Sequence, residues 1–245
     1  MSKVLTIFDA DYIGFYICHN KKDQPIKSLE DCILLCDEMI LNINTHLKAN
    51  VYIGFLGKGK CFRHYINDKY KANRKYDDEI KYIPEVREHL KTYHNFKSLE
   101  GFEADDLCIS FRNKYKEQYN CIVVSPDKDL LNLEGCNYNP KKSELIFKTK
   151  NEEELYFWKS MIIGDGADNI SGIKGYGPVA ADKLINKCTY FEGLRTLIFE
   201  EYCKVYGEYK GIEEFYKNYM CLKILDNVPM ENFIINKITN NILSD

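Results

Sequence analysis

The sequence predicts an α/β fold, with a mostly parallel central sheet flanked by helices. Short apolar stretches typical of buried strands lie at residues 3–9, 51–56 and 121–125. Between them, apolar residues recur at helical spacing over residues 29–47, and residues 103–119 resemble a helix with an acidic first turn. Strands that alternate with helices favour a parallel sheet covered on both faces.

The pattern changes after about residue 150, where strand signals fade and stretches such as ELYFWKSMII and EEFYKNYMCLKIL have helical spacing. We therefore expect an α/β domain over residues 1–150 and a helical region over residues 151–245. We expect the final stretch to pack as helix against the sheet. Ligand sites in such folds gather at the carboxyl ends of the strands.

Composition is that of a globular protein, with 45% hydrophobic and 29% charged residues among 245. No apolar run approaches the roughly 18–20 residues of a membrane span, and early carboxylates argue against a signal peptide. We expect a cytoplasmic protein that does not bind membranes. The ten cysteines include no CxxC pair, which favours reduced, buried thiols over a zinc cage or disulfides. The five histidines show no ligand-like pairing in the sequence.

Carboxylates collect where the predicted strands end and helices begin. Singly, each group has an ordinary explanation as a helix cap or turn residue. Together in one cleft they would repel one another, by about 1 kcal/mol per pair at 4 Å in water and roughly four times that near a protein surface. The residues are Asp9, Asp11, Glu103, Asp105, Asp106, Asp127, Asp129, Asp165 and Asp168.

Divalent cations would relieve this repulsion. All-oxygen sites rich in carboxylate suit Mg²⁺ or Mn²⁺ better than Zn²⁺. Two such ions a few ångströms apart can activate a water and stabilise a leaving oxygen, so the pattern favours hydrolysis of nucleic acid.

Two further segments predict phosphate contacts. Residues 58–75 carry seven Lys or Arg and one Asp, a local charge of 7 − 1 = +6, and are too polar for a core. Tyr65, Tyr70 and Tyr76 lie among or beside these charges and could stack on unpaired bases. In SGIKGYGPVAADKLI (residues 171–185), a glycine turn precedes a helix N-terminus, which would present N–H groups to a DNA backbone. A plain connection between helices is the alternative reading of this segment.

With these stretches in view, residues 4–190 resemble the 5′-nuclease family, which comprises flap endonucleases, phage 5′-to-3′ exonucleases and the nuclease domain of bacterial DNA polymerase I. IFDADYIGF is similar to the family's first-strand motif, and GKGKCFRHYINDKYKANR to its arch-base segment. GFEADDL, SPDKDLLNL and IIGDGADNISGIKGYGPVAADKLI resemble its helix start, its aspartate-pair loop, and its last aspartate pair with a helix-three-turn-helix. The resemblance implies a PIN-like fold with an arch over about residues 58–95.

The resemblance also implies roles for single residues. Asp9, Glu103, Asp105 and Asp106 would surround a first metal ion, Asp127 would lie near both ions, and Asp129, Asp165 and Asp168 would serve the second. Lys71 and Arg74 match the basic pair that engages the scissile phosphate, and Tyr70 would stack nearby. Catalysis would depend on Lys71, Arg74, Asp9, Asp105 and Asp127. Nucleic acid would contact Lys58, Lys60, Arg63, Tyr70, Lys71, Arg74, Gly172, Lys174, Gly175, Gly177 and Lys183, with a potassium ion on the carbonyls of the glycine turn.

One position departs from the family pattern. Family members carry an aspartate at the end of the second strand, where this chain has Leu56 or Gly57. If strand geometry continues past Asp9, Asp11 points to the same face and could replace the missing charge.

The leading expectation is therefore a metal-dependent, structure-selective 5′-to-3′ exonuclease or flap endonuclease that acts in DNA replication or repair. Its partners would be flapped, branched or nicked DNA, and RNA–DNA hybrid, and the protein would be a monomer of phage type. The alternatives are a catalytically weakened DNA-binding protein of the same fold and a PIN-type ribonuclease, against which the glycine turn argues.

Overall fold

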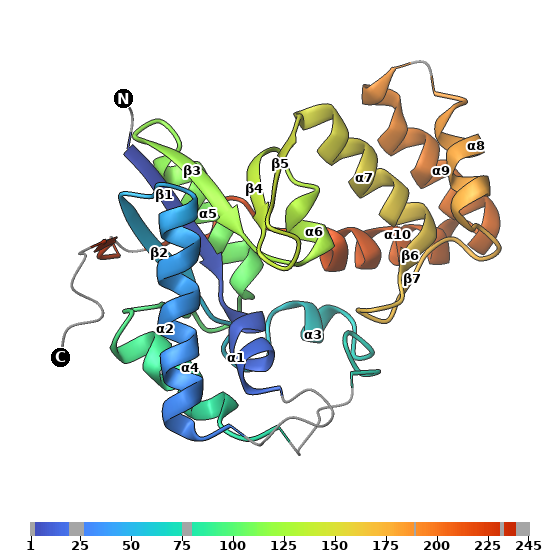
Figure 1. The fold of residues 1–245 in the computed structure, drawn as a ribbon. Coiled ribbons are helices and arrows are strands. Elements are labelled where there is room, and N and C mark those ends of the chain that lie inside the picture. Colours follow the sequence, from blue (N-terminus) through green and yellow to red (C-terminus); the bar gives the residue numbers. More distant parts are fainter. Residues whose placement is uncertain (1–2, 20–26, 75–79, 189, 231–232, 239–245) are drawn as a thin grey trace.

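A six-stranded sheet in the order β5-β4-β3-β1-β2-β8 forms the centre of the protein (Figure 1). The computed structural model describes residues 3–19, 27–74, 80–188, 190–230 and 233–238. The strands β2, β1, β3 and β4 run parallel, whereas β5 and β8 pair antiparallel at the two edges. The bounds are β1 (Lys3–Asp9), β2 (Val51–Phe55), β3 (Tyr119–Val124), β4 (Gly135–Asn139), β5 (Glu144–Lys148) and β8 (Asn236–Lys237).

The parallel centre of the sheet agrees with the sequence prediction, but the edge strands were not predicted. β4 begins with Gly135 and is rich in asparagine, residues that are depleted in strands. In β5, the apolar residues Leu145 and Phe147 are exposed. The strand therefore has no buried apolar face whose alternation could be recognised in the sequence.

Three helices cover one face of the sheet, namely α1 (Asp11–Cys18), α2 (Leu29–His46) and α4 (Ile83–Thr92). Their apolar side chains form one core with Phe8, Tyr52 and Leu56. Ser28 caps α2 in a capping box with Asp31, which fixes where that helix begins.

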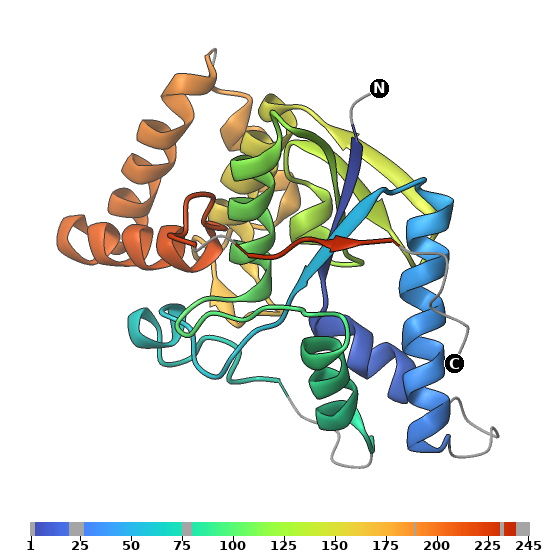
Figure 2. The same cartoon turned by 90° about the vertical axis from the view of Figure 1, so that its left-hand side faces the viewer.

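The opposite face is covered by α5 (Ala104–Tyr115) and by the C-terminal segment (Figure 2). Ile224 and Val228 are buried beside α5, and β8 then pairs with β2. The expected helical character of residues 151–245 is therefore wrong at its end, because the chain returns to the sheet as an extended segment.

A second, helical lobe has its own core around Met161, Ile198 and Phe215. It contains α7 (Lys150–Ile163), α8 (Pro178–Ile185), the 3₁₀ helix η1 (Phe191–Gly193), α9 (Leu194–Tyr206) and α10 (Glu208–Leu222). The short hairpin β6 (Gly164–Asp165) and β7 (Ile170–Ser171) leads from α7 toward α8. Two short helices, α3 (Arg63–Ile66) and α6 (Lys128–Leu131), lie between the lobes. Within the described residues, no helix is both long and apolar enough to cross a membrane.

Candidate metal centre and nucleic-acid interface

Asp9 and Asp127 meet at the carboxyl ends of β1 and β3, where Ser125 joins them. The Ser125 hydroxyl donates to Asp9 Oδ2 at 2.8 Å and accepts from the Asp127 amide at 3.0 Å. Burial, together with the nearby charges of Asp11 and Asp127, raises the pKa of Asp9 to about 7. Desolvation of the carboxyl group also raises the pKa of Asp127, although this residue is more exposed than Asp9.

Asp105, in the first turn of α5, faces the same region. Burial and the adjacent Asp106 hold its pKa well above the usual range. Cys108 lies one turn further along α5, and its pKa is raised by burial and by the charges of both Asp9 and Asp105. The charges of both carboxylates therefore disfavour ionisation of the same buried thiol.

The acids that flank Asp105 are paired with a buried arginine. Arg63 donates two hydrogen bonds of 2.7 Å to Asp106 and one of 2.9 Å to Glu103. The Leu225 amide donates to Asp106 at 2.8 Å. Burial works against ionisation of Glu103, but Lys71 and Arg63 more than offset it and lower the pKa.

Asp129 and Asp165 are joined by Lys128. The Lys128 ammonium lies 2.6 Å from Asp165 Oδ2 and 3.1 Å from Asp129 Oδ1. Tyr156 of α7 donates to Asp129 at 2.6 Å, so a helix of the second lobe reaches this group. Burial opposes the charge of Asp165, yet the hydrogen bond from Lys128 lowers the pKa.

Asp168 is held by the segment that follows α3. Arg74 contacts one carboxylate oxygen at 2.7 Å, and the Tyr70 hydroxyl oxygen lies 3.1 Å from the other. The Lys71 ammonium lies 3.7 Å from Asp168 and also contacts Glu103. Lys71 adopts a left-handed backbone conformation, with φ of 55°, and its amide donates to the Asp168 carbonyl at 3.0 Å.

These acids fall into two classes. Glu103, Asp106, Asp129, Asp165 and Asp168 each have a Lys or Arg partner. Within the described residues, Asp9, Asp105 and Asp127 form no ion pair, and all three have raised pKa values. Glu103, Asp105 and Asp106 offer carboxylate oxygens that lie within 4.8 Å of one another, a donor set that suits a hard divalent ion. One pocket is lined by Asp105 of the second class and by Asp129, Asp165 and Asp168 of the first, together with Arg63, Tyr70 and Tyr156.

Asp11 is placed differently from the expectation. The strand ends at Asp9, and Asp11 begins α1, so the premise of a continued strand is wrong. Its carboxylate accepts from the Gly57 amide at 3.0 and 3.1 Å and pairs with Arg87 at 2.6 Å. A β-carbon on Gly57 would lie 2.9 Å from Asp11 Oδ2, whereas Leu56 is fully buried in the core. The Asp11 carboxylate thus occupies the space that a side chain at residue 57 would need.

Two predicted nucleic-acid contacts require correction. The Arg63 side chain is only 2% exposed and is committed to Asp106 and Glu103, so it cannot reach a phosphate. Tyr70 is 3% exposed, and its hydroxyl donates to Glu103 at 2.7 Å, so it offers no face to a base. Residues 58–75 were expected to be too polar for a core, but Arg63, Tyr70 and Cys61 are buried. Tyr65 is exposed, whereas Lys75 and Tyr76 lie outside the described residues.

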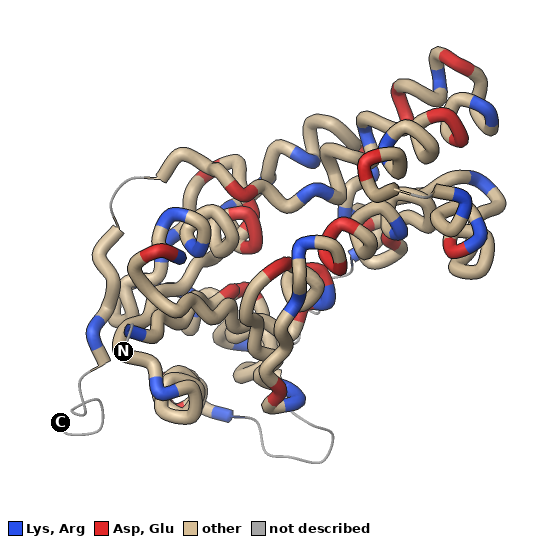
Figure 3. The backbone as a smooth tube through the Cα atoms, turned by 90° about the horizontal axis from the view of Figure 1, so that it is seen from above, with Lys and Arg blue, Asp and Glu red and all other residues tan. Residues whose placement is uncertain are grey.

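The remaining predicted contacts are accessible, apart from one glycine. Lys58, Lys60, Arg74, Lys174 and Lys183 are exposed, as are Gly175 and Gly177. Gly172 is buried, and a β-carbon there would lie 2.2 Å from the Ile162 carbonyl oxygen, so it serves a close backbone approach. Lys and Arg are interspersed with Asp and Glu along the chain (Figure 3). The local excess of positive charge at residues 58–75 therefore says more about binding to phosphates than the total charge does.

Four residues of the site were not predicted from the sequence. Two of them lie in a segment that was singled out for its aspartates. Ser125 and Lys128 lie in SPDKD, where the aspartates drew attention. Their contacts exist only once the loop has folded, because the loop then turns the Ser125 hydroxyl toward Asp9 and the Lys128 ammonium toward Asp165. Tyr156 and Arg87 are distant from the acids in sequence, and no local pattern marks them.

The fold is thus an α/β sheet with acidic residues gathered at the carboxyl ends of its parallel strands, where proteins of this architecture place their ligand sites. The family described as 5′-3′ exonuclease, N-terminal resolvase-like domain, matches residues 7–156. The chain belongs to this family.

Similar proteins carry related descriptions. A 5′-3′ exonuclease of Mycoplasmopsis pulmonis is 29% identical over 203 residues, which cover 76% of this chain and 67% of that protein. A DNA polymerase I of Borreliella burgdorferi is 28% identical over 99% of this chain, but the match spans only 29% of the polymerase. A 5′-3′ exonuclease of Mycoplasma genitalium is 29% identical, with 64% of this chain and 62% of that protein covered.

Solved structures show the same fold. The T5 D15 protein, co-crystallised with metal ions, superposes with a TM-score of 0.69 at 22% identity, over 91% of this chain and 90% of that one. The catalytic core of Rad2 in complex with a DNA substrate gives a TM-score of 0.55 at 14% identity, over 94% and 75% of the two chains.

Proposed function

We propose that this protein is a metal-dependent, structure-selective 5′-nuclease that hydrolyses phosphodiesters near 5′ ends, flaps or RNA primers in DNA. The observation that carries the proposal is the set of three carboxylates without an ion pair in the described residues, Asp9, Asp105 and Asp127, of which Asp105 lines a pocket shared with Asp129, Asp165 and Asp168. Family membership supports the same reaction class.

The carboxylates would hold two Mg²⁺ or Mn²⁺ ions. Asp9, Glu103 and Asp105 would serve one ion, Asp127 would lie near both, and Asp129, Asp165 and Asp168 would serve the other. Because Asp106 is committed to Arg63, its part is to hold Arg63 and Glu103 in position. When bound, such ions activate a water and stabilise the leaving oxygen of a phosphodiester.

Lys71 and Arg74 would bind the scissile phosphate. Both cations contact carboxylates of the site, Lys71 at Glu103 and Arg74 at Asp168. A phosphate could replace one carboxylate contact without leaving either cation unpaired, and the charge developed in the reaction would be stabilised by both. The connection from Gly172 to α8, with exposed Lys174 and Lys183, would act as a helix-three-turn-helix that grips duplex DNA, with K⁺ on its carbonyls.

Asp11 would supply the charge that residue 57 lacks. Its carboxylate fills the space beside Gly57 and acts on Asp9, whose pKa it raises. An Asp11→Ala variant should lose most of its cleavage rate, and adding Gly57→Asp to that variant should restore part of it. A silent Asp11→Ala variant would refute this part of the proposal.

A 5′-labelled flap duplex tests the function directly. We expect Mg²⁺-dependent cleavage near the branch, absent with EDTA and reduced at least about 100-fold by Asp105→Asn. The second candidate is a DNA-binding protein with weakened catalysis, which the buried Leu56 favours. Tight binding of the same duplex without cleavage would select it.

A further inference from the structure

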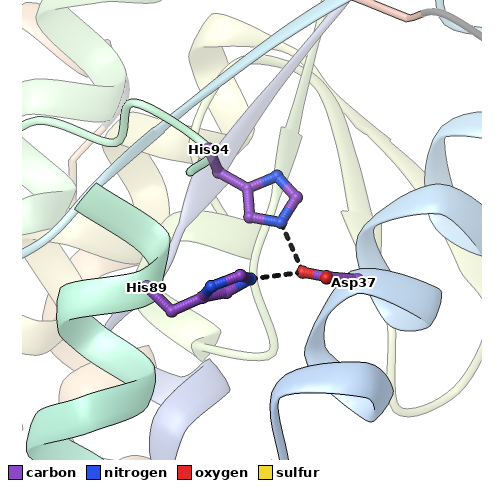
Figure 4. A group of neighbouring side chains, drawn as sticks. All are labelled: Asp37, His89 and His94. Carbon is purple, nitrogen blue, oxygen red and sulfur yellow. Dashed lines mark hydrogen bonds and ion pairs between the residues drawn. The ribbon is translucent and has the colours of Figure 1, made fainter. Parts of the chain in front are cut away.

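Three side chains outside the acidic pocket converge on a single oxygen atom. Asp37 lies in α2, His89 in α4, and His94 just beyond the end of α4. The Nε2 atoms of His89 and His94 each lie 2.7 Å from Asp37 Oδ1, and both rings point at this carboxylate (Figure 4). The absence of histidine pairing inferred from the sequence is therefore wrong, because folding brings the two imidazoles together.

Neighbouring aromatic residues hold both rings in place. His89 stacks on Tyr93, with ring centroids 5.0 Å apart and planes within 13°. His94 is fully buried, and its Nδ1 lies 2.9 Å from the Tyr52 hydroxyl. The two imidazole planes meet at 80°, so the rings approach the carboxylate from different directions instead of stacking.

We propose that Asp37, His89 and His94 form a binding site for one divalent transition-metal ion of the zinc type. Two imidazole nitrogens and one carboxylate oxygen are a ligand set that zinc accepts and that Mg²⁺ disfavours. Ligand atoms about 2.0 Å from a tetrahedral ion lie roughly 3.3 Å apart, so the 2.7 Å contacts need to open by about half an ångström. Water would take the fourth position.

The surroundings fit a bound ion in two further ways. The Nε2 atoms of His89 and His94 already face the same Asp37 oxygen, so an ion that took the place of their protons would meet all three ligand atoms. Once Nε2 of His94 binds the ion, the ring proton resides on Nδ1, where the Tyr52 oxygen accepts it. Asp37 and His89 are each 16% exposed, which leaves the ion a path from solvent.

The site is separate from the acidic pocket. It lies between α2 and α4 on one face of the sheet, whereas Asp105 lies in the first turn of α5, which covers the other face. Since α4 also carries Arg87, which pairs with Asp11, an ion here would fix α4 against α2 and hold that arginine in place. Its role would be structural.

Co²⁺ titration of the chelator-treated full-length protein, with excess Mg²⁺ to occupy the acidic pocket, tests the site. We expect visible absorption bands that saturate at one ion per chain and vanish when one equivalent of Zn²⁺ is added. Two control variants should retain the bands. One is Asp105→Asn, and the other is His46→Gln, which replaces an exposed histidine of α2. His89→Gln should weaken binding at least about 100-fold.

Either of two results would overturn the site: no bands in the wild type, or equal binding by wild type and His89→Gln. Zinc-edge X-ray absorption of the wild type decides the case even if His89→Gln fails to fold. Scattering from two imidazoles is expected, and an all-oxygen shell would contradict the proposal. Flap cleavage plays no part in these measurements, so their failure leaves the proposed nuclease untouched.

Discussion

Arg63 and Asp106 form a two-pronged ion pair inside the protein, with both hydrogen bonds 2.7 Å long and neither side chain more than 2% exposed. The pair ties α3 to the start of α5, and Arg63 also donates to the Cys221 and Lys223 carbonyls at the end of α10. One side chain therefore joins the sheet domain to the helical lobe.

Arg63→Met should destabilise the fold by about 3–5 kcal/mol, because it leaves the Asp106 charge buried without its partner. Urea unfolding monitored by circular dichroism measures this loss. Lys58→Ala is the matched control, since the Lys58–Glu100 pair is exposed and 3.4 Å long. Equal stability of the two variants would contradict a structural role for Arg63.

Asp105→Asn should abolish Mg²⁺-dependent cleavage and yet raise the melting temperature in EDTA. The substitution removes a carboxylate that has no ion pair and whose ionisation burial disfavours. Differential scanning calorimetry with EDTA and with Mg²⁺ separates the effects, because Mg²⁺ should stabilise the wild type more than the variant. A melting temperature that falls in EDTA would show that Asp105 is held by contacts of its own.

The metal-free protein should lose stability as the pH rises from about 4 to 7. The pKa of Asp9 is 3.8 as a free group and about 7 when folded, so between these values the native state binds more protons than the unfolded chain. The stability difference between wild type and Asp9→Asn in EDTA should change by a few kcal/mol across this window. Saturating Mg²⁺ should flatten the slope. A pH-independent difference would exclude the raised pKa.

Gly172→Ala should cost roughly 1–3 kcal/mol or more, because the new β-carbon would lie 2.2 Å from the Ile162 carbonyl oxygen. Gly177→Ala meets nothing within 4 Å and has an ordinary φ of −100°, so its stability should stay near that of the wild type. Thermal unfolding compares the two. The same change in both would show that the turn can shift to make room.

The sequence predicted the parts of this molecule that depend on local pattern. The strands that end at Asp9 and Val124 are apolar runs, and the acids after them lie where parallel strands bring ligands together. By contrast, β8 has two residues and is defined only by its pairing with β2, so it carries no signal of its own.

The part that a single residue plays was harder to predict where a side chain that is usually exposed is buried. Arg63 and Tyr70 lie in a basic stretch that reads as a phosphate-binding surface, yet both are enclosed by carboxylates from distant segments. His89 and His94 come together with Asp37 only because α4 packs on α2. Such contacts depend on tertiary packing, which single-sequence patterns do not encode.

Anomalous diffraction from a crystal soaked in Mn²⁺ tests the central claim most directly. The account predicts an ion in contact with carboxylate oxygens of Asp105 and at least one of Asp9 and Asp127, because these three acids have no Lys or Arg partner within the described residues. An occupied Mn²⁺ site elsewhere, with all three carboxylates free of metal at saturating concentration, would contradict it.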